Sequence, residues 1–279
     1  MKKILTSTIF LIFILAGQSF ANTSETPPGN LGVEIGFETS YITYKEPSVM
    51  KQKGGMCGVN VAFTYRGWVP PLSLDNDRSM LKIEARGSYG QVDYTSESGS
   101  RIDGIDDRIF EIRGLGGYSL FVSDNSIITP YVGYGYRYLN DDMAGKISTA
   151  GAAGYERQSN YYYIPIGIES ITVFEDGDYV EVKLEYDYFC RGKQMSLLGA
   201  IPGYVDIKNN QGNGHGYRGS IKFHNKGEKI DFFIEPFIRY WSIAESEKAY
   251  YSYYGIIPMV AWEPKNNSKE FGMNFTIKY

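Results

Sequence analysis

The chain has 279 residues and a formal charge of −4 at neutral pH, from 28 Lys and Arg against 32 Asp and Glu. Its basic residues are scattered and form no stripe, which excludes a nucleic-acid-binding protein. Aromatic residues make up 15% of the chain and include 25 tyrosines, whose apolar ring and polar tip suit a membrane–water interface.

Residues 1–21 have the pattern of a secretory signal peptide. Lys2 and Lys3 precede a short apolar run, and small residues at Ser19 and Ala21 form a cleavage site. The run is too short for a stable spanning helix, and Gln18 stands where a lipoprotein signal needs cysteine. We therefore expect cleavage after Ala21 and one mature domain over 22–279, with a charge of −4 − 2 = −6.

From residue 31 onward, apolar and polar residues alternate with period two in segments separated by Gly, Asn, Asp and Ser. Val180, Val182 and Leu184, for example, alternate with Glu181 and Lys183. No apolar run after the signal approaches a spanning helix, so a spanning structure must be a closed barrel. We expect strands near 31–44, 57–66, 81–89, 110–120, 130–139, 162–169, 180–188, 217–224, 230–240 and 271–279.

The predicted fold is all-β: one antiparallel, up-and-down transmembrane β-barrel of ten strands, with eight or twelve as alternatives. Its connections alternate in length, as short periplasmic turns and long external loops do. Only 67–79 is longer than this rule predicts for a periplasmic turn. An even strand number places both chain ends in the periplasm. The short turns are 122–125, 175–178 and 225–228, and the long segments lie near 45–55, 93–107, 140–158, 190–215 and 243–267.

The face opposite the apolar one carries charges of both signs in nearly equal number. On a lipid face each charge would cost about 2–4 kcal/mol near the bilayer midplane, whereas inside a narrow barrel the charges can pair across strands. We therefore predict a charge network in the lumen, made of Glu84, Arg86, Glu111, Arg113, Arg137, Glu169, Glu181, Lys183, Glu185, Arg218, Lys222, Glu235 and Arg239.

The last nine residues, FGMNFTIKY, resemble the C-terminal strand signal of bacterial outer-membrane proteins. The resemblance implies a Gram-negative outer-membrane location and recognition of this strand by the barrel-assembly machinery. Strand number and length also look like the ten-stranded barrels that include the omptin proteases. The strand should pair with 31–44 to close the barrel. The signal residues are Phe271, Met273, Phe275, Ile277 and Tyr279.

The sequence offers few candidates for chemistry. His215 has no acidic neighbour in sequence, and we expect His224 to be a lumen residue within the charge network. We expect Cys57 and Cys190 to be unpaired thiols on the lipid side, because their strands lie far apart in the barrel. We therefore predict no catalytic, cofactor-binding or metal-binding residues.

Three functions fit these features. The first is a structural or adhesin-like role, in which tyrosine-rich external loops bind a host or cell-surface ligand. The second is a small porin-like channel. The third is an omptin-like or lipid-modifying hydrolase, if a histidine meets a carboxylate. The other expected partners are outer-membrane lipid and lipopolysaccharide.

Overall fold

The computed structural model describes residues 31–67 and 78–278. The predicted signal peptide, Tyr279 and most of the segment 67–79 lie outside these residues. Within the described ranges, no helix is long and apolar enough to cross a membrane.

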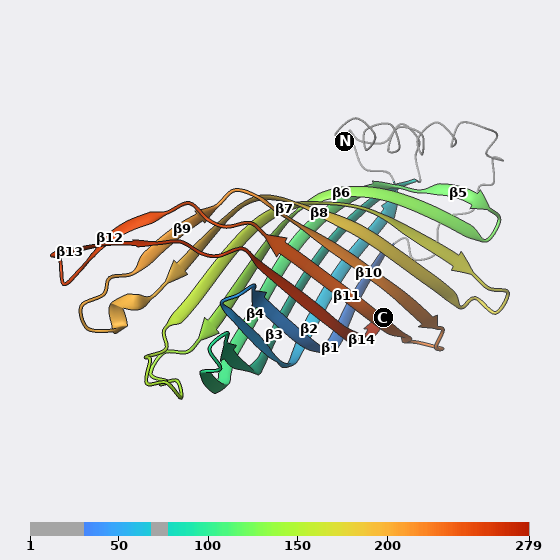
Figure 1. The fold of residues 1–279 in the computed structure, drawn as a ribbon. Helices are drawn as coiled ribbons and strands as arrows, with labels where there is room; N and C mark the ends of the chain where they lie inside the picture. The colour runs from blue at the N-terminus through green and yellow to red at the C-terminus, as the bar shows by residue number, and fades with distance from the viewer. Residues whose placement is uncertain (1–30, 68–77, 279) are drawn as a thin grey trace.

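The described chain is mostly β-strand (Figure 1). Ten long strands build one antiparallel sheet: β1 (Leu31–Glu46), β2 (Met50–Gly67), β3 (Ser79–Ser96), β4 (Arg101–Tyr118), β6 (Ser126–Asp142), β7 (Glu156–Val173), β8 (Tyr179–Ser196), β10 (Gly214–Asn225), β11 (Asp231–Ile243) and β14 (Asn266–Lys278). The short elements are β5 (Leu120–Ser123), η2 (Leu198–Ala200), β9 (Ile207–Gln211), β12 (Ala249–Tyr253) and β13 (Ile257–Ala261).

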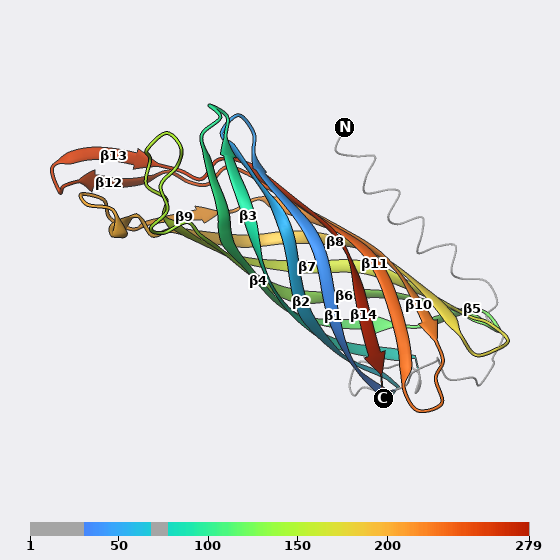
Figure 2. The same cartoon turned by 90° about the horizontal axis from the view of Figure 1, so that it is seen from below.

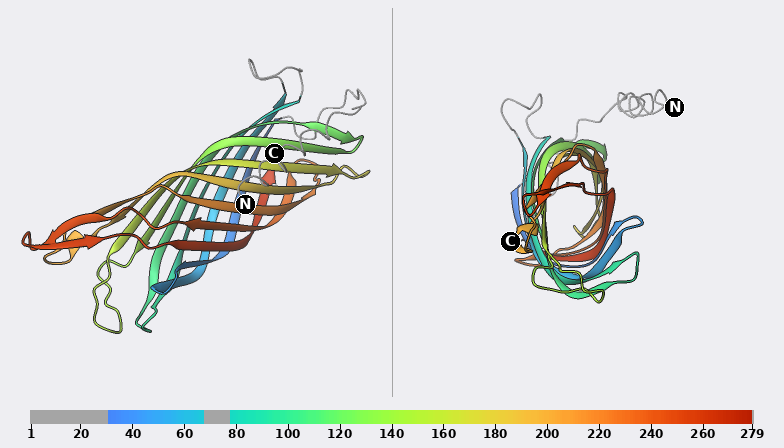
Figure 3. Two further views of the ribbon diagram at one scale, coloured as in Figure 1. Left: turned by 45° about the horizontal axis from the view of Figure 1, so that its top comes forward. Right: turned by 60° about the vertical axis from the view of Figure 1, so that its left-hand side comes forward.

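The sheet closes on itself. β1 pairs with β2 on one side and with β14 on the other (Figure 2). Phe37 on β1 is opposite Phe275 on β14. β10 pairs with both β11 and β8, so every long strand has two neighbours. The end-on view in Figure 3 shows the resulting ring. The predicted ten-stranded barrel and its closure by the last strand are confirmed.

Two of the predicted external loops are wrong. The segments 45–55 and 93–107 are mostly strand, and the connections that remain are 47–49 between β1 and β2 and 97–100 between β3 and β4. The first four strands contain 16 or 18 residues, whereas about 9–11 are enough to cross a bilayer. These strands therefore continue beyond the membrane on the extracellular side.

The sequence pattern hid these extensions because polarity reverses along each strand. On β3, outward-facing Leu81 and Ile83 are exposed near the periplasmic end, while inward-facing Lys82 is buried. Further along the same strand, inward-facing Val92 is 1% exposed and outward-facing Asp93 is exposed. Side chains still alternate between the inner and outer faces of the strand, but here the outer face is in water and no longer in lipid. An apolar cluster fills the barrel here: Ile42, Met56, Val92, Ile102, Ile105, Ile109 and Met143.

Below these extracellular extensions, on the side toward the periplasm, the outer surface is a continuous apolar belt over all ten strands. Because the same strands carry buried charges on their inner face, the surroundings of this belt must be lipid. The belt includes Val33, Ile35, Phe37, Val59, Val61, Ile83, Phe110, Ile112, Val132, Ile166, Ile168, Leu184, Ile221, Phe223, Ile234, Ile238, Phe271, Phe275 and Ile277.

The two cysteines lie on β2 and β8, which do not pair with each other. Cys57 and Cys190 are both free thiols, the first exposed on the outer face and the second half-buried. Cys190 lies where the pairing of β7 with β8 shifts by one residue, a β-bulge between Phe189 and Arg191.

Candidate functional site

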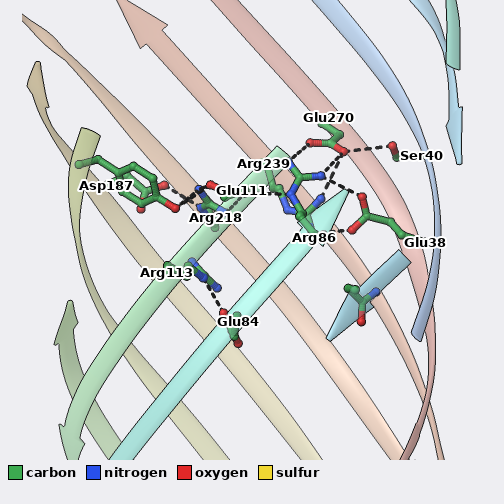
Figure 4. Close-up of polar contacts among 12 residues, drawn as sticks. Glu38, Ser40, Glu84, Arg86, Glu111, Arg113, Asp187, Arg218, Arg239 and Glu270 are labelled. Carbon is green, nitrogen blue, oxygen red and sulfur yellow. Dashed lines mark hydrogen bonds and ion pairs between the residues drawn. The ribbon is translucent and has the colours of Figure 1, made fainter. Parts of the chain in front are cut away.

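The centre of the lumen is built around Arg86 on β3. Its Nε lies 2.8 Å from Glu111 Oε2, and Nη1 lies 2.9 Å from Glu38 Oε1 and 3.0 Å from Glu270 Oε1 (Figure 4). Arg239 on β11 lies across the same two carboxylates, 2.9 Å from Glu38 and 3.2 Å from Glu270. Glu38 and Glu270 thus bridge the two guanidinium groups, and Glu111 pairs with Arg86 alone of the two. The five residues come from the stretch of wall between β11 and β4, across the junction of β14 with β1.

A second group of ion pairs adjoins the first through Glu111. Arg218 on β10 contacts Glu111, and its Nε lies 2.7 Å from Asp187 Oδ2 and 3.1 Å from Glu185 Oε1 (Figure 4). Glu185 also accepts a hydrogen bond of 2.5 Å from Arg113 Nη1. The pairs span β4, β8 and β10, so they connect opposite walls of the lumen.

The periplasmic half of the lumen holds the lysine-rich part of the network. Glu169 on β7 pairs with Arg66 and with Lys82, whose Nζ lies 3.0 Å away. Lys183 lies 3.3 Å from Glu181, and Lys222 Nζ lies 2.7 Å from Glu34 Oε2. These charges are buried and paired, as charges in a low-dielectric interior must be.

The structure places every predicted network residue on the lumen side, and among residues 31–67 and 78–278 all but Arg137 and Glu235 form ion pairs there. Arg137 is 2% exposed and stacks over the Trp241 ring at 5.4 Å. Glu235 accepts a 3.0 Å hydrogen bond from Asn274 Nδ2. Both residues contribute to the filling of the lumen.

The network leaves little free space. A cavity of about 100 Å³ lies among its central residues, including Arg86, Glu111 and Lys222. A second cavity of about 40 Å³ lies above it, against Arg137 and Trp241. Such volumes hold a few water molecules. Between them, Trp241 packs edge-to-face on Tyr163 with ring centroids 5.0 Å apart.

Sequence reasoning missed a second polar cluster at the extracellular end. Arg157, at the start of β7, lies 2.7 Å from Glu46 Oε1 and 2.8 Å from Asp141 Oδ2. The Tyr44 hydroxyl lies between Glu46 and Glu263, 3.0 and 3.1 Å from their Oε1 atoms, and can donate to either. The sequence did contain a signal for it. Arg157 is separated from the inward-facing Tyr161 and Tyr163 by an even number of residues, so it lies on the same face of the strand, although it precedes the expected start of that strand.

Glu263 attaches the last external segment, 244–265, to this cluster. It lies between β13 and β14 and is 6% exposed. Burial raises the pKa of its carboxyl to about 7; Arg157 opposes this rise, and the nearby Glu46 carboxylate adds to it. Its backbone N–H also donates to Ser246 Oγ at 2.8 Å, closing the base of the segment.

We expect acid to strengthen this attachment. A carboxyl whose pKa is raised in the folded state stabilises that state below its ordinary pKa, and the contribution is lost as pH rises through about 7. Hydrogen exchange in 244–265 should therefore become about tenfold faster between pH 5 and pH 8, after correction for intrinsic exchange. Glu263→Gln should abolish most of this dependence. An equal pH dependence in that variant would contradict the assignment.

The two histidines lie apart from each other and from the extracellular end of the lumen. His215 is on the outer face of β10, 5.4 Å from the Tyr217 ring, and no carboxylate contact involves it within the described residues. His224 lies near the periplasmic end, stacked on Tyr179 at 4.2 Å. Its Nε2 lies 3.3 Å from Asp231 and its Nδ1 3.7 Å from Asp178. A carboxylate is thus within reach of His224, but on the periplasmic side.

In the part of the chain that the structure describes, no group of three His, Cys, Asp or Glu side chains is placed to hold a metal ion. The C-terminal strand residues Phe271, Phe275 and Ile277 face outward and are exposed, and Met273 is half-buried. They belong to the lipid-facing belt, where the closing strand meets β1.

Similar structures share the barrel. The crystal structure of the outer membrane protease OmpT from Escherichia coli aligns with 92% of this chain and 99% of its own, at 10% identity and a TM-score of 0.59. The translocator domain of the autotransporter NalP from Neisseria meningitidis covers 97% of this chain and 94% of its own, at 10% identity and a TM-score of 0.39. No protein-family model matches the sequence. A search of the curated proteins found no relative.

The closed sheet, the charged lumen and the lipid-facing belt define a class. The protein is an integral β-barrel of the bacterial outer-membrane type, with ten antiparallel strands. Its likeness to OmpT concerns the fold alone, because identity is only 10%.

Proposed function

We propose that this protein is a non-enzymatic outer-membrane barrel that binds partners outside the cell through the hairpin β12–β13. The observation that carries this proposal is the exposure of large apolar side chains in a segment beyond the barrel. Tyr250 and Ile256 are each 82% exposed, and Trp262 is 45% exposed. Such a patch outside the lipid belt is typical of an interaction surface.

The hairpin is held in a defined position, as a binding surface requires. Tyr253 packs on Tyr204 with ring centroids 4.8 Å apart and on Tyr254 at 4.6 Å. The Tyr254 N–H donates to the Gly203 carbonyl at 2.8 Å. The segment that follows η2 therefore contacts the hairpin and supports it. Figure 1 shows this segment beside β12 and β13, beyond the end of the barrel.

A binding assay with the full-length protein in detergent tests the proposal, using a panel of immobilised extracellular proteins and glycans. We expect micromolar or tighter binding to at least one member. Truncating the three exposed anchors together, as Tyr250→Ser, Ile256→Ser and Trp262→Ser, should weaken this binding at least tenfold. The matched control is Ile147→Ser with Val49→Ser, which removes exposed apolar side chains elsewhere on the extracellular side. Equal binding by the hairpin variant, or no binding at all, would contradict the proposal.

The filled lumen favours a binding protein over a channel. The ion pairs of Arg86 and Arg218, with Trp241 and Tyr163 above them, occupy the cross-section of a barrel only slightly wider than a filled eight-stranded one. We expect no steady conductance in planar bilayers at neutral pH. Stepwise openings by single proteins would instead favour the porin-like alternative.

The hydrolase alternative needs a general base beside a carboxylate at a place that substrate can reach. His215 lies on the outer face among tyrosines, and the carboxylates beside His224 lie at the periplasmic end. This arrangement favours a binding role over hydrolysis at the cell surface.

A further inference from the structure

Four lysines lie together on the outer face of the barrel, across the extracellular ends of β14, β1 and β2. Lys45 is opposite Lys51 on β2 and Asn267 on β14. Two residues closer to the membrane, Thr43 lies between Lys53 and Lys269. Directly opposed residues have Cβ atoms about 5 Å apart. The four ammonium groups therefore belong to two adjacent rows of the sheet.

This arrangement is unfavourable without an anion. Like charges directly opposite each other destabilise a sheet, and among the described residues no ion pair joins any of the four lysines to a carboxylate. The acid nearest in register is Asp93, opposite Lys53 on β3, and its Oδ1 accepts the Gly104 N–H at 3.0 Å. Lys269 Nζ lies 5.9 Å from the Tyr240 ring. We refer to Lys45, Lys51, Lys53 and Lys269 as the lysine patch.

A hollow joins the lysine patch to the apolar belt. It has a volume of about 330 Å³, and its polar side is formed by Thr43, Lys45, Lys51, Asn267 and Lys269, whereas Lys53 lies beside it. Its other side is formed by Ile238 and Phe271, which are 57% and 60% exposed. Glu270 also lines the hollow, but its carboxylate is in the lumen, 3.0 Å from Arg86. The next row of the sheet toward the membrane is apolar, with Tyr41 beside Phe271 at a ring distance of 5.8 Å.

We propose that the lysine patch binds the phosphate groups of an anionic lipid of the outer leaflet. The patch lies at the extracellular edge of the lipid-facing surface, at the level of the headgroups. Its lysines complement phosphate, which ammonium groups bind as point charges. Phe271 and Ile238 then contact the first part of an acyl chain. This inference does not depend on the role of β12–β13, which lies in the extracellular part of the chain.

The test measures the affinity of the full chain in neutral detergent micelles for bisphosphorylated lipid A and for the same lipid after removal of its phosphates. We expect tighter binding of the phosphorylated form. Replacing the whole lysine patch with glutamine should weaken that binding by about fivefold for each lysine, and the dephosphorylated lipid should be unaffected. Inorganic phosphate at the same concentration as the lipid should not compete with it.

The matched control replaces four other exposed lysines with glutamine: Lys208, Lys229, Lys248 and Lys265. It removes the same charge and should change the affinity less than twofold. If the variant that lacks all four lysines does not fold, the double variant Lys45→Gln with Lys269→Gln takes its place in the same affinity measurement. An equal loss in the control, equal affinity for the dephosphorylated lipid, or displacement by equimolar inorganic phosphate would overturn the proposal.

Discussion

Replacing Arg86 with methionine should lower the free energy of unfolding by about 3–5 kcal/mol, because it leaves buried carboxylates without their counter-charge. Arg86 contacts Glu38, Glu111 and Glu270 within 3.1 Å, and the two glutamates that it shares with Arg239 are each 2% exposed or less. Urea unfolding of the protein in detergent micelles measures the effect, followed as loss of the compact gel mobility of the folded barrel.

Two variants separate charge from shape. Arg101→Met removes an exposed arginine at the extracellular start of β4 and should change stability by less than about 0.5 kcal/mol. Combining Arg86→Met with Glu270→Gln should recover part of the loss, because one uncompensated carboxylate is removed while Glu38 keeps its ion pair with Arg239 at 2.9 Å. If Arg86→Met were as stable as the unmodified protein, the network would not stabilise the barrel.

Gly135→Ala should destabilise the barrel by about 3 kcal/mol through overpacking in the lumen and loss of a buried hydrogen bond. Tyr163 on β7 lies flat over Gly135 on β6, its cross-strand partner, and an added Cβ would come within 2.2 Å of the ring. The ring cannot move freely, because its hydroxyl donates to Glu111 Oε1 at 2.6 Å. The change is measured as a shift in the midpoint of urea unfolding, with the dependence of the unfolding free energy on urea concentration unchanged.

Gly114→Ala is the matched control for this prediction. Gly114 lies on the neighbouring strand β4, but an added Cβ there meets nothing within 4 Å. Its substitution should cost less than about 0.5 kcal/mol. In a Tyr163→Leu background the added cost of Gly135→Ala should largely disappear, since the ring it would meet is gone. A full cost in that background would place the clash elsewhere.

The same arrangement recurs once more, four residues away along both strands toward the periplasmic end. Tyr131 on β6 lies over Gly167 on β7, and its hydroxyl donates to Glu185 Oε2 at 2.8 Å. Period-two alternation puts Tyr131 and Gly135 on the same face of their strand as Arg137, which was predicted to point inward. It did not predict the contacts, because they depend on the register between β6 and β7 and on the tilt of both rings.

The ion pairs in the lumen show the same limit of prediction from sequence. The alternation of charged and apolar residues predicted which side chains point inward, since a charge on the lipid face is costly. The partners could not be predicted: Arg86 and Glu270 are 184 residues apart and meet because β14 closes onto β1. Arg137 was expected to join the ion pairs, but the structure places it over Trp241.

The sequence by itself determined the class of fold. Period-two alternation, the absence of a long apolar run and the closing strand from Phe271 onward were sufficient, because lipid admits few structures whose backbone groups are all paired. Only the tertiary structure decided where the strands end, which charges pair, and which side chains gather outside. Strand ends were hidden because polarity reverses where lipid gives way to water, as between Leu81 and Asp93. The lysine patch exists only because closure brings β14 beside β1, so residues more than 200 positions apart share one surface.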